Sequence, residues 1–386
     1  MQFAHSEEQQ LIRESARTLL GERAGSAQLR AALDQPGGYD SELWRTMGEL
    51  GWMGLAIQQA YGGAGLGWVE LCILQEEQGR RLVASPFFAT CALAAPMITA
   101  CGDEAQRASL LQQVASGVVR IGCALIGSDG RPPCDGVSVV LESRGADFRL
   151  SGVSDFVIHG ESADLLLVLA RTPGSQAEDG ISVAVIPAAT AGVSVHPHVM
   201  LDLTRPMSRV EFAGVAVRRD QLLGVPGAAG SAVEEALDLA RIALASEALG
   251  GAERLLEMTT AYAKERVQFG RPIGAFQAIK HRLADMMVTV EAARSAAWYA
   301  ASVADERREE LAEAAAIAKS YCCDAFFDCA ANAIQLHGGI GFTWEHDAHL
   351  YFKRARATAT LLGSPGWQRE RLVRRFASGA ASTPVF

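Results

Sequence analysis

Apolar side chains recur at helical spacing in the first third of the chain. The segment at residues 6–22 opens with Ser6 and, three residues later, Gln9, which is the spacing of a capping box. The apolar positions behind it are Leu11, Ile12, Ala16, Leu19 and Leu20. This spacing of three and four residues predicts an amphipathic helix, and further helical stretches follow to residue 115.

The pattern changes between residues 118 and 220. Short β-rich runs are separated there by Gly, Asp, Pro and Ser turns. The runs are VSVVLES, FRLSGVSDFVIHG, ADLLLVLAR, GISVAVIPA and SRVEFAGVAV. Several short strands at this spacing predict a β-sandwich or barrel.

Helical periodicity returns from residue 228. We expect a long helix over 276–303 and another from residue 308. The second helix keeps an apolar stripe of Leu311, Ala315, Ala318, Cys322, Ala325, Cys329 and Leu336. Long, Ala-rich helices of this kind favour a bundle, packed within one subunit or between subunits.

These three patterns together predict an α+β fold. We expect an N-terminal helical domain over 1–116, a middle β-sandwich or barrel domain over 117–226 and a C-terminal four-helix bundle over 227–386. A chain of 386 residues is long enough to bury a large core across such domains.

Composition narrows the possible functions. The formal net charge of −9 argues against a nucleic-acid footprint, which needs a basic stripe to neutralise phosphates. No apolar run reaches the roughly 18 residues of a membrane helix, and MQFAHSEEQQ does not have the layout of a secretory signal, so we expect a cytoplasmic protein. The eight cysteines form no C-x-x-C pair and are expected to be small core residues.

Two glycine-containing segments are the first candidates for a phosphate-binding site. AYGGAGLG has neither the Lys-Ser/Thr of a P-loop nor G-x-G-x-x-G spacing, so we expect a tight turn. ERVQFGRPIGAFQ lies where one helix ends and the next begins, with Arg266 and Arg271 in it. These arginines suit a pyrophosphate, and solvated arginines at a helix connection are the alternative.

Two further groups of residues are candidates. In QLHGGIGFTWEHDAH, Gly338 and Gly339 let the backbone approach a ligand closely, because glycine has no side chain. His346, Asp347 and His349 give at most half a metal site, so no metal is expected. In LDLARIAL, Asp238 and Arg241 share a helix face, either as an exposed pair or as a pair pointed at a ligand.

Four segments carry a resemblance to a known family. ELGWMGLAIQQAYGGAGLG, RVQFGRPIGAFQ, LADMM and QLHGGIGFTWEHDAHLYFKRA resemble the acyl-CoA dehydrogenase family, in order and over nearly the whole chain. The resemblance implies an FAD enzyme in which a carboxylate takes the α proton of an acyl-CoA and the flavin accepts a hydride from the β carbon. It also implies a tetramer with FAD at a dimer interface, and an electron-transfer acceptor.

The resemblance implies that one half of the FAD site is intact. Arg266 and Phe269 match R-x-x-F-G, Gln277 matches the glutamine that follows it, and Gln335, Gly338 and Gly339 match Q-x-x-G-G. In the family these residues are lent to the FAD of the neighbouring subunit, and we call them the lending residues. Asp238 and Arg241 match a D-x-x-R that faces the CoA thioester.

The half of the site that receives the flavin ring departs from the family pattern. Against T-E-P-x-x-G-S-D this chain has GCALIGSDG, which keeps Ser128 and Asp129 as substrate-side residues but has no hydroxyl at the Thr. Phe156 stands for the Trp that packs on the flavin, and Ile158 for a Thr.

The catalytic acid is also missing at both places where the family keeps it. Leu362 aligns with the Glu of Y-E-G-T, and Ala240 with the Glu found in other members. Loss of a general base typically lowers the rate by about 10²- to 10⁴-fold.

Three hypotheses follow. The chain is one subunit of a hetero-oligomeric α2β2 acyl-CoA dehydrogenase, which its resemblance to steroid side-chain dehydrogenases favours. Alternatively, it is a homo-oligomeric dehydrogenase with a displaced carboxylate, for which Glu345, Asp347 and Glu247 are candidates. The third hypothesis is a non-catalytic acyl-CoA-binding protein of the same fold, and no residue of the sequence defines the acyl group.

Overall fold

The computed structural model describes residues 5–127, 129–145 and 147–379. Its described parts form two compact units. A helical unit contains residues 1–31, 68–83 and 241–386, and a sheet unit contains residues 32–67 and 84–240. The three predicted domain boundaries remain predictions.

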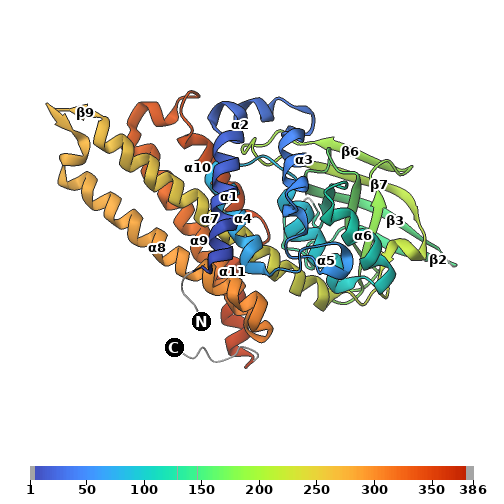
Figure 1. Cartoon of the computed structure of the whole chain (residues 1–386). Coiled ribbons are helices and arrows are strands. Elements are labelled where there is room, and N and C mark those ends of the chain that lie inside the picture. Colours follow the sequence, from blue (N-terminus) through green and yellow to red (C-terminus); the bar gives the residue numbers. More distant parts are fainter. Residues whose placement is uncertain (1–4, 128, 146, 380–386) are drawn as a thin grey trace. The chain divides into compact units, whose positions relative to one another are not determined.

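The helical unit is built from long helices (Figure 1). Their bounds are α1 Glu7–Arg23, α2 Ser26–Leu33, α4 Trp68–Arg81, α7 Gly230–Glu265, α8 Gln277–Glu306, α9 Leu311–His337, α10 Ala348–Thr360 and α11 Pro365–Ala377. The end of α2 and the first part of α7, residues 32–33 and 230–240, belong to the sheet unit. The two helices expected over 276–303 and from residue 308 are α8 and α9, and α9 packs against α8, α10 and α11. The C-terminal helical domain is therefore confirmed.

The predicted capping box begins α1. The Ser6 side chain accepts a hydrogen bond from the backbone N–H of Gln9 at 3.2 Å, and the Gln9 side chain accepts from the Ser6 N–H at 3.0 Å. Two N–H groups that a helix start leaves unpaired are satisfied in this way.

Two glycines allow α4 and α7 to lie unusually close. A Cβ atom at Gly79 would stand 2.0 Å from the carbonyl oxygen of Glu247, and one at Gly250 would stand 1.8 Å from that of Glu76. Both distances are far below van der Waals contact, so only glycine is compatible with this crossing.

The sheet unit contains α3 (Ser41–Glu49), the π-helix η4 (Phe88–Ala94), α5 (Ala95–Cys101) and α6 (Glu104–Ala115) beside one sheet. The strands are β1 Ile121–Ala124, β2 Val140–Arg144, β3 Asp147–Ile158, β4 Leu165–Arg171, β5 Ile181–Pro187, β6 Val193–Pro197, β7 Met207–Val217 and β8 Leu222–Leu223. Their order is β6-β7-β3-β1-β4-β5-β8. β1 and β2 both pair with β3 on one side and with β4 on the other. The two short strands therefore lie end to end in the same place in the sheet.

The middle β domain is thus confirmed. Its core contains the inward side chains of several strands, among them Leu150, Val168, Ile186 and Phe212.

The segment AYGGAGLG is a turn, as expected, with Gly62 and Gly65 at φ of 81° and 68°. These angles lie in the left-handed region that glycine adopts without strain.

Candidate functional site

The first lending segment is a short hairpin between α7 and α8. The strands β9 (Val267–Gln268) and β10 (Arg271–Pro272) pair antiparallel around a two-residue turn, Phe269 and Gly270, with φ of 54° and 76°. Positive φ at both positions is the requirement of a tight hairpin turn. The Phe269 side chain, at the tip of this hairpin, is 93% exposed.

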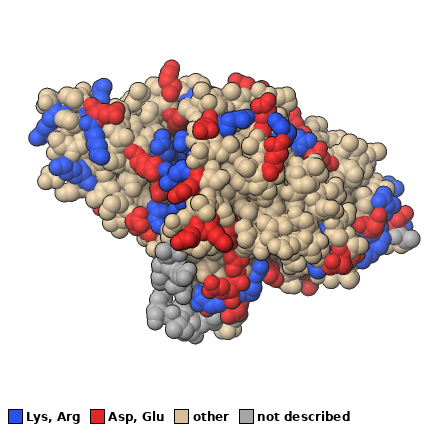
Figure 2. All heavy atoms as spheres, viewed as in Figure 1, with Lys and Arg blue, Asp and Glu red and all other residues tan. Residues whose placement is uncertain are grey.

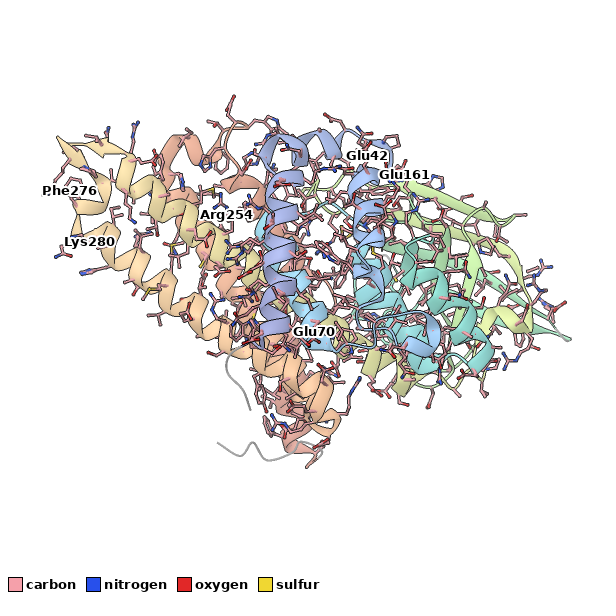
Figure 3. The ribbon with its side chains drawn as sticks, viewed as in Figure 1. Glu42, Glu70, Glu161, Arg254, Phe276 and Lys280 are labelled. Carbon is pink, nitrogen blue, oxygen red and sulfur yellow. The ribbon has the colours of Figure 1, made fainter. Side chains whose placement is uncertain are left out.

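The side chains around this hairpin are open to solvent. Arg266, Arg271 and Gln277 are all exposed. The Arg271 guanidinium lies 4.2 Å from the ring centre of Phe276. Phe276 and Lys280 lie at the start of α8, beside the hairpin, in Figure 3. In Figure 2 basic side chains gather over this end of the helical unit. Arg266 is therefore free to meet an anionic group from outside the chain.

The second lending segment follows α9. The 3-10 helix η8 (Gly338–Phe342) begins directly after His337, and Gln335 lies exposed on the last turn of α9. A Cβ atom at Gly338 or Gly339 would meet nothing within 4 Å. The backbone of these two glycines is therefore an open surface that a ligand can approach.

Tyr262 joins the two segments. Its carbonyl oxygen accepts the Arg266 N–H at 2.8 Å, and its hydroxyl donates to the carbonyl oxygen of His337 at 3.3 Å. The rings of Tyr262 and His337 are stacked with centroids 4.4 Å apart. The structure thus brings together lending residues that are about seventy positions apart in the sequence.

The lending residues fit the chemistry of FAD. The set offers an exposed guanidinium, two exposed amides, an exposed aromatic ring and an accessible glycine backbone, which are suitable partners for a pyrophosphate, a ribose and a planar ring. None of these groups is buried inside its own chain, so each is accessible to a ligand.

Leu362 lies in a closed loop between α10 and α11. Its φ is 56°, its side chain is 4% exposed, and Gly363 follows at φ 99°. The Leu362 carbonyl oxygen accepts hydrogen bonds from the Nε of Arg241 at 3.1 Å and the Nε2 of Gln368 at 3.0 Å. A left-handed leucine costs about 1–2 kcal/mol, so these contacts hold a conformation that is strained on its own.

A buried lysine fixes the start of the same loop. Lys319 is fully buried, and its ammonium group donates to the carbonyl oxygens of Thr358, Ala359 and Gly363 at 3.0, 3.3 and 3.4 Å. A cation at this place complements the negative end of α10. The position that the family resemblance gives to an acid is therefore occupied by an apolar side chain in a rigid loop.

Two of the three predicted substrate residues, Asp238 and Arg241, lie on α7. Asp238 is 3% exposed, Arg241 is fully buried, and so is Ala240, the other position aligned with a catalytic Glu. The Arg241 guanidinium contacts Leu362 and lies 5.3 Å from the ring centre of Trp367. Its expected contact with CoA remains a prediction.

The alternative carboxylates have partners within the chain or lie on its surface. Glu247 is buried and bonds to Arg354 at 3.0 Å. Asp347 bonds to Arg30 and to the Ser26 hydroxyl, both at 2.7 Å. Glu345 is exposed to solvent.

The receiving segment lies in the sheet unit. Ser128 is outside the described residues, and Asp129 forms a surface ion pair with Arg131 at 2.6 Å. Phe156 sits at a register shift between β3 and β7, with φ 56° and 39% exposure, while Ile158 is buried. A partly exposed aromatic ring is thus present at the predicted stacking position.

His198 is a residue that the sequence motifs did not indicate. Its ring stacks on Phe156 with centroids 5.5 Å apart, and its Nε2 lies 3.0 Å from a carboxylate oxygen of Asp155. It belongs to no motif and is about forty positions from Phe156. Only the pairing of β3, β6 and β7 brings the two rings together.

Within residues 5–127, 129–145 and 147–379, no three His, Cys, Asp or Glu side chains gather closely enough to hold a metal ion. The eight cysteines are free thiols, and all except the half-buried Cys101 are buried, as predicted for core residues. Burial raises the pKa of the Cys72 thiol to about 12. No helix in this part of the chain is long and apolar enough to cross a membrane.

Comparison with known proteins places these features in context. Residues 6–118 match the model of the acyl-CoA dehydrogenase N-terminal domain, and residues 230–377 match that of the C-terminal domain. The chain is 38% identical to the acyl-CoA dehydrogenase IpdE2 of Mycobacterium tuberculosis, over 93% of this chain and 94% of that protein.

Two solved structures are similar over almost their whole length. One is the ChsE4–ChsE5 complex of Mycobacterium tuberculosis, with a TM-score of 0.89 and 28% identity over 100% of both chains. The other is a variant of the Tcur3481–Tcur3483 steroid ACAD, with a TM-score of 0.86 and 32% identity over 97% of this chain and 99% of the other.

Proposed function

This chain belongs to the acyl-CoA dehydrogenase family, whose members are oxidoreductases, and we propose that it is a subunit that completes the FAD site of a different dehydrogenase chain. The assembly would oxidise an acyl-CoA thioester between its α and β carbons. In this proposal the partner supplies the flavin-ring pocket and the catalytic carboxylate.

The observation that carries the proposal is the closed loop at Leu362. A proton-abstracting site needs a carboxylate within reach of its substrate. Here the position has a buried leucine whose carbonyl oxygen is held by Arg241 and Gln368, and Ala240 offers no acid either. The lending residues are nevertheless retained and exposed, which favours a protein that contributes to a neighbour's site.

The lending residues have distinct roles in this proposal. Arg266 binds the pyrophosphate of FAD, Gln277 and Gln335 donate amide hydrogen bonds, and Phe269 and the Gly338–Gly339 backbone contact the adenosine part. The chemistry that the family's FAD supplies is acceptance of a hydride from the β carbon. This chain orients the cofactor, while Asp238 and Arg241 lie on the expected CoA side.

The displaced-carboxylate alternative is less well supported. Glu247 is neutralised by Arg354, and Asp347 by Arg30. Both carboxylates are thus held in ion pairs within their own chain, and Glu247 is also buried. Glu345 is exposed, where water competes for the same proton transfer.

The comparisons also support a particular assembly and substrate class. The ChsE4–ChsE5 structure is a complex of two differently named chains, and Tcur3481–Tcur3483 is named a steroid ACAD. We therefore propose a heteromeric α2β2 assembly in the cytoplasm, with a steroid side-chain CoA as substrate and a separate electron-transfer acceptor. The non-catalytic acyl-CoA-binding protein gives no reason for retaining Arg266, Gln277 and Gln335 together.

Co-expression tests the proposal. The chain is purified alone and together with an acyl-CoA dehydrogenase encoded beside it, and flavin absorbance and subunit composition are measured. One FAD for each pair of chains, present only after co-expression, is the expected result. One FAD per chain in the lone protein, with acyl-CoA oxidation, would establish the homo-oligomeric alternative instead. Binding of acyl-CoA without FAD in either preparation would establish the non-catalytic one.

A further inference from the structure

Three histidines lie directly beneath the glycine loop η8. His337 is the last residue of α9. Its ring stacks on that of Tyr262 and contacts that of His346 at a tilt of 50°, with both centroid distances 4.4 Å. The His349 ring contacts that of Trp344 in a tilted arrangement, with the centroids 5.1 Å apart. We call His337, His346 and His349 the histidine cluster.

The surroundings of the cluster favour neutral rings. His337 Nδ1 lies 2.8 Å from the carbonyl oxygen of Ala333 and donates to it, a hydrogen bond that the neutral and the protonated ring can both make. The Nε2 of His337 is buried and has no hydrogen-bond partner among the described residues. A proton placed there would create a buried cation with nothing to accept its hydrogen bond.

The contacts of His346 and His349 also favour neutral rings. His346 Nδ1 accepts the N–H of Ala348 at 3.1 Å, so it is not protonated in this arrangement. His349 is 6% exposed, and its Nε2 is likewise buried without a partner in the described part of the chain. Charging any of the three rings therefore conflicts with its present contacts.

The surrounding charges oppose protonation as well. The guanidinium of Arg30 and the ammonium of Lys353 both lie over the Trp344 ring, at 5.5 and 5.6 Å. The nearby anion, Asp347, is already bonded to Arg30. Tyr262, the group facing His337 from α7, is an aromatic ring with a hydroxyl that is engaged with the His337 carbonyl oxygen.

Both burial and charge lower the affinity of the cluster for protons. Burial is the main cause of a lowered pKa at all three histidines. The neighbouring cations Arg30 and Lys353 lower it further at His349, and Arg30 does so at His346, while Asp347 acts in the opposite direction at both.

We propose that the histidine cluster is a proton-operated latch for the glycine loop. Neutral rings pack the loop against Tyr262 and α9, and protonated rings leave this stack, which releases residues 338–342. The imidazole pKa is 6.5 in the unfolded chain and lower when the stack is closed. The open state therefore binds more protons, and opening grows as the pH falls below 6.5.

The consequence for FAD rests on the proposed function. If the glycine loop holds the cofactor of a partner chain, opening the latch weakens that contact at mildly acidic pH. The latch itself depends only on residues of the helical unit, so the two statements are tested separately.

Hydrogen exchange of the purified complex tests the latch. Exchange of the peptide spanning residues 338–343 is measured by mass spectrometry at about pH 7.5 and about pH 5.5, and corrected for the intrinsic rate at each pH. If the open loop binds one proton more than the closed loop, we expect the equilibrium constant for opening to be about tenfold larger at the lower pH. A His346→Phe variant keeps a stacking ring without a titrating nitrogen and should reduce this dependence. A His281→Gln variant, which alters an exposed histidine of α8, is the control and should not.

Flavin release measured on the same samples separates the possible outcomes. Equal protection of the loop at both pH values, or the same pH dependence in His346→Phe and wild type, would overturn the latch. Loop opening with FAD fully retained would leave the latch standing and overturn the cofactor role of the loop. Loop opening together with faster FAD release supports both.

Discussion

The Nε of Arg241 donates a hydrogen bond of 3.1 Å to the carbonyl oxygen of Leu362, across 121 positions of sequence. Gln368 donates to the same oxygen at 3.0 Å. An arginine expected to face the substrate thus supports a loop in which a leucine replaces an acid. The absence of the base and the burial of the arginine are parts of one local structure.

Replacing Arg241 by Met should loosen this loop. The Leu362 carbonyl oxygen would lose one of the two donors that the described residues give it, and loss of a charged hydrogen bond in a buried site lowers the free energy of unfolding by about 1–3 kcal/mol. Urea denaturation measures the change. Arg374→Met is the control, because Arg374 is an exposed arginine of α11 in a surface ion pair with Glu370, and we expect a change of about 0.5 kcal/mol or less. Equal losses in both variants would argue against a specific role for the Arg241–Leu362 bond.

Gly250→Ala should destabilise the helical unit. In an ordinary helix this change is favourable by about 0.5–1 kcal/mol. At Gly250 the new Cβ would stand 1.8 Å from the Glu76 carbonyl oxygen, so α4 and α7 must separate, and we expect a net loss of about 1–3 kcal/mol or more. Gly339→Ala meets no atom within 4 Å and should leave the melting temperature unchanged. A Gly250→Ala protein as stable as wild type would show that this crossing can relax.

Arg266→Ala should reduce FAD retention in the assembled protein. A guanidinium bound to a pyrophosphate contributes charged hydrogen bonds, and losing them weakens binding by about tenfold or more. Lys280→Ala removes an equally exposed cation from the same end of α8 and should not affect retention (Figure 3). Flavin absorbance after gel filtration gives the comparison. Unchanged FAD content in Arg266→Ala would refute the lending role of this residue.

His5 should make stability depend on pH in the acid range. Burial, with Arg13 as a further cause, lowers the pKa of His5 to about 4, and its ring packs 4.2 Å from that of Trp298. Between the unfolded pKa of 6.5 and this value, the unfolded chain binds a proton that the folded chain does not. Stability therefore falls as the pH drops from 6.5 towards 4.

A His5→Phe variant, which keeps the ring contact, should lose less stability on acidification than wild type. Urea unfolding at about pH 7.5 and about pH 5 measures the difference. The His281→Gln variant should follow wild type, since that side chain is exposed. An acid-induced loss that is the same in His5→Phe and wild type would assign the effect to other groups.

The sequence by itself determined most of the helices and strands, and it located the segments for which we propose the lending role. The spacing of Leu311, Ala315 and Cys322 predicts α9, and the alternation of turn residues with β-rich runs predicts the middle sheet, because both depend on local periodicity. R-x-x-F-G and Q-x-x-G-G locate two exposed segments, the hairpin before α8 and the glycine loop after α9, for a similar reason. Each is a short motif whose backbone geometry is encoded within a few residues.

Only the tertiary structure decided which distant side chains became partners. Nothing near Arg241 in the sequence indicates that it binds Leu362, and no motif pairs His198 with Phe156 or brings His337 against both Tyr262 and His346. A buried donor or ring must satisfy its contacts with whatever the packed helices and strands bring near it. Those neighbours are set by the crossing of α4 and α7, the register of the sheet and the closure of loops, which no local pattern of residues specifies.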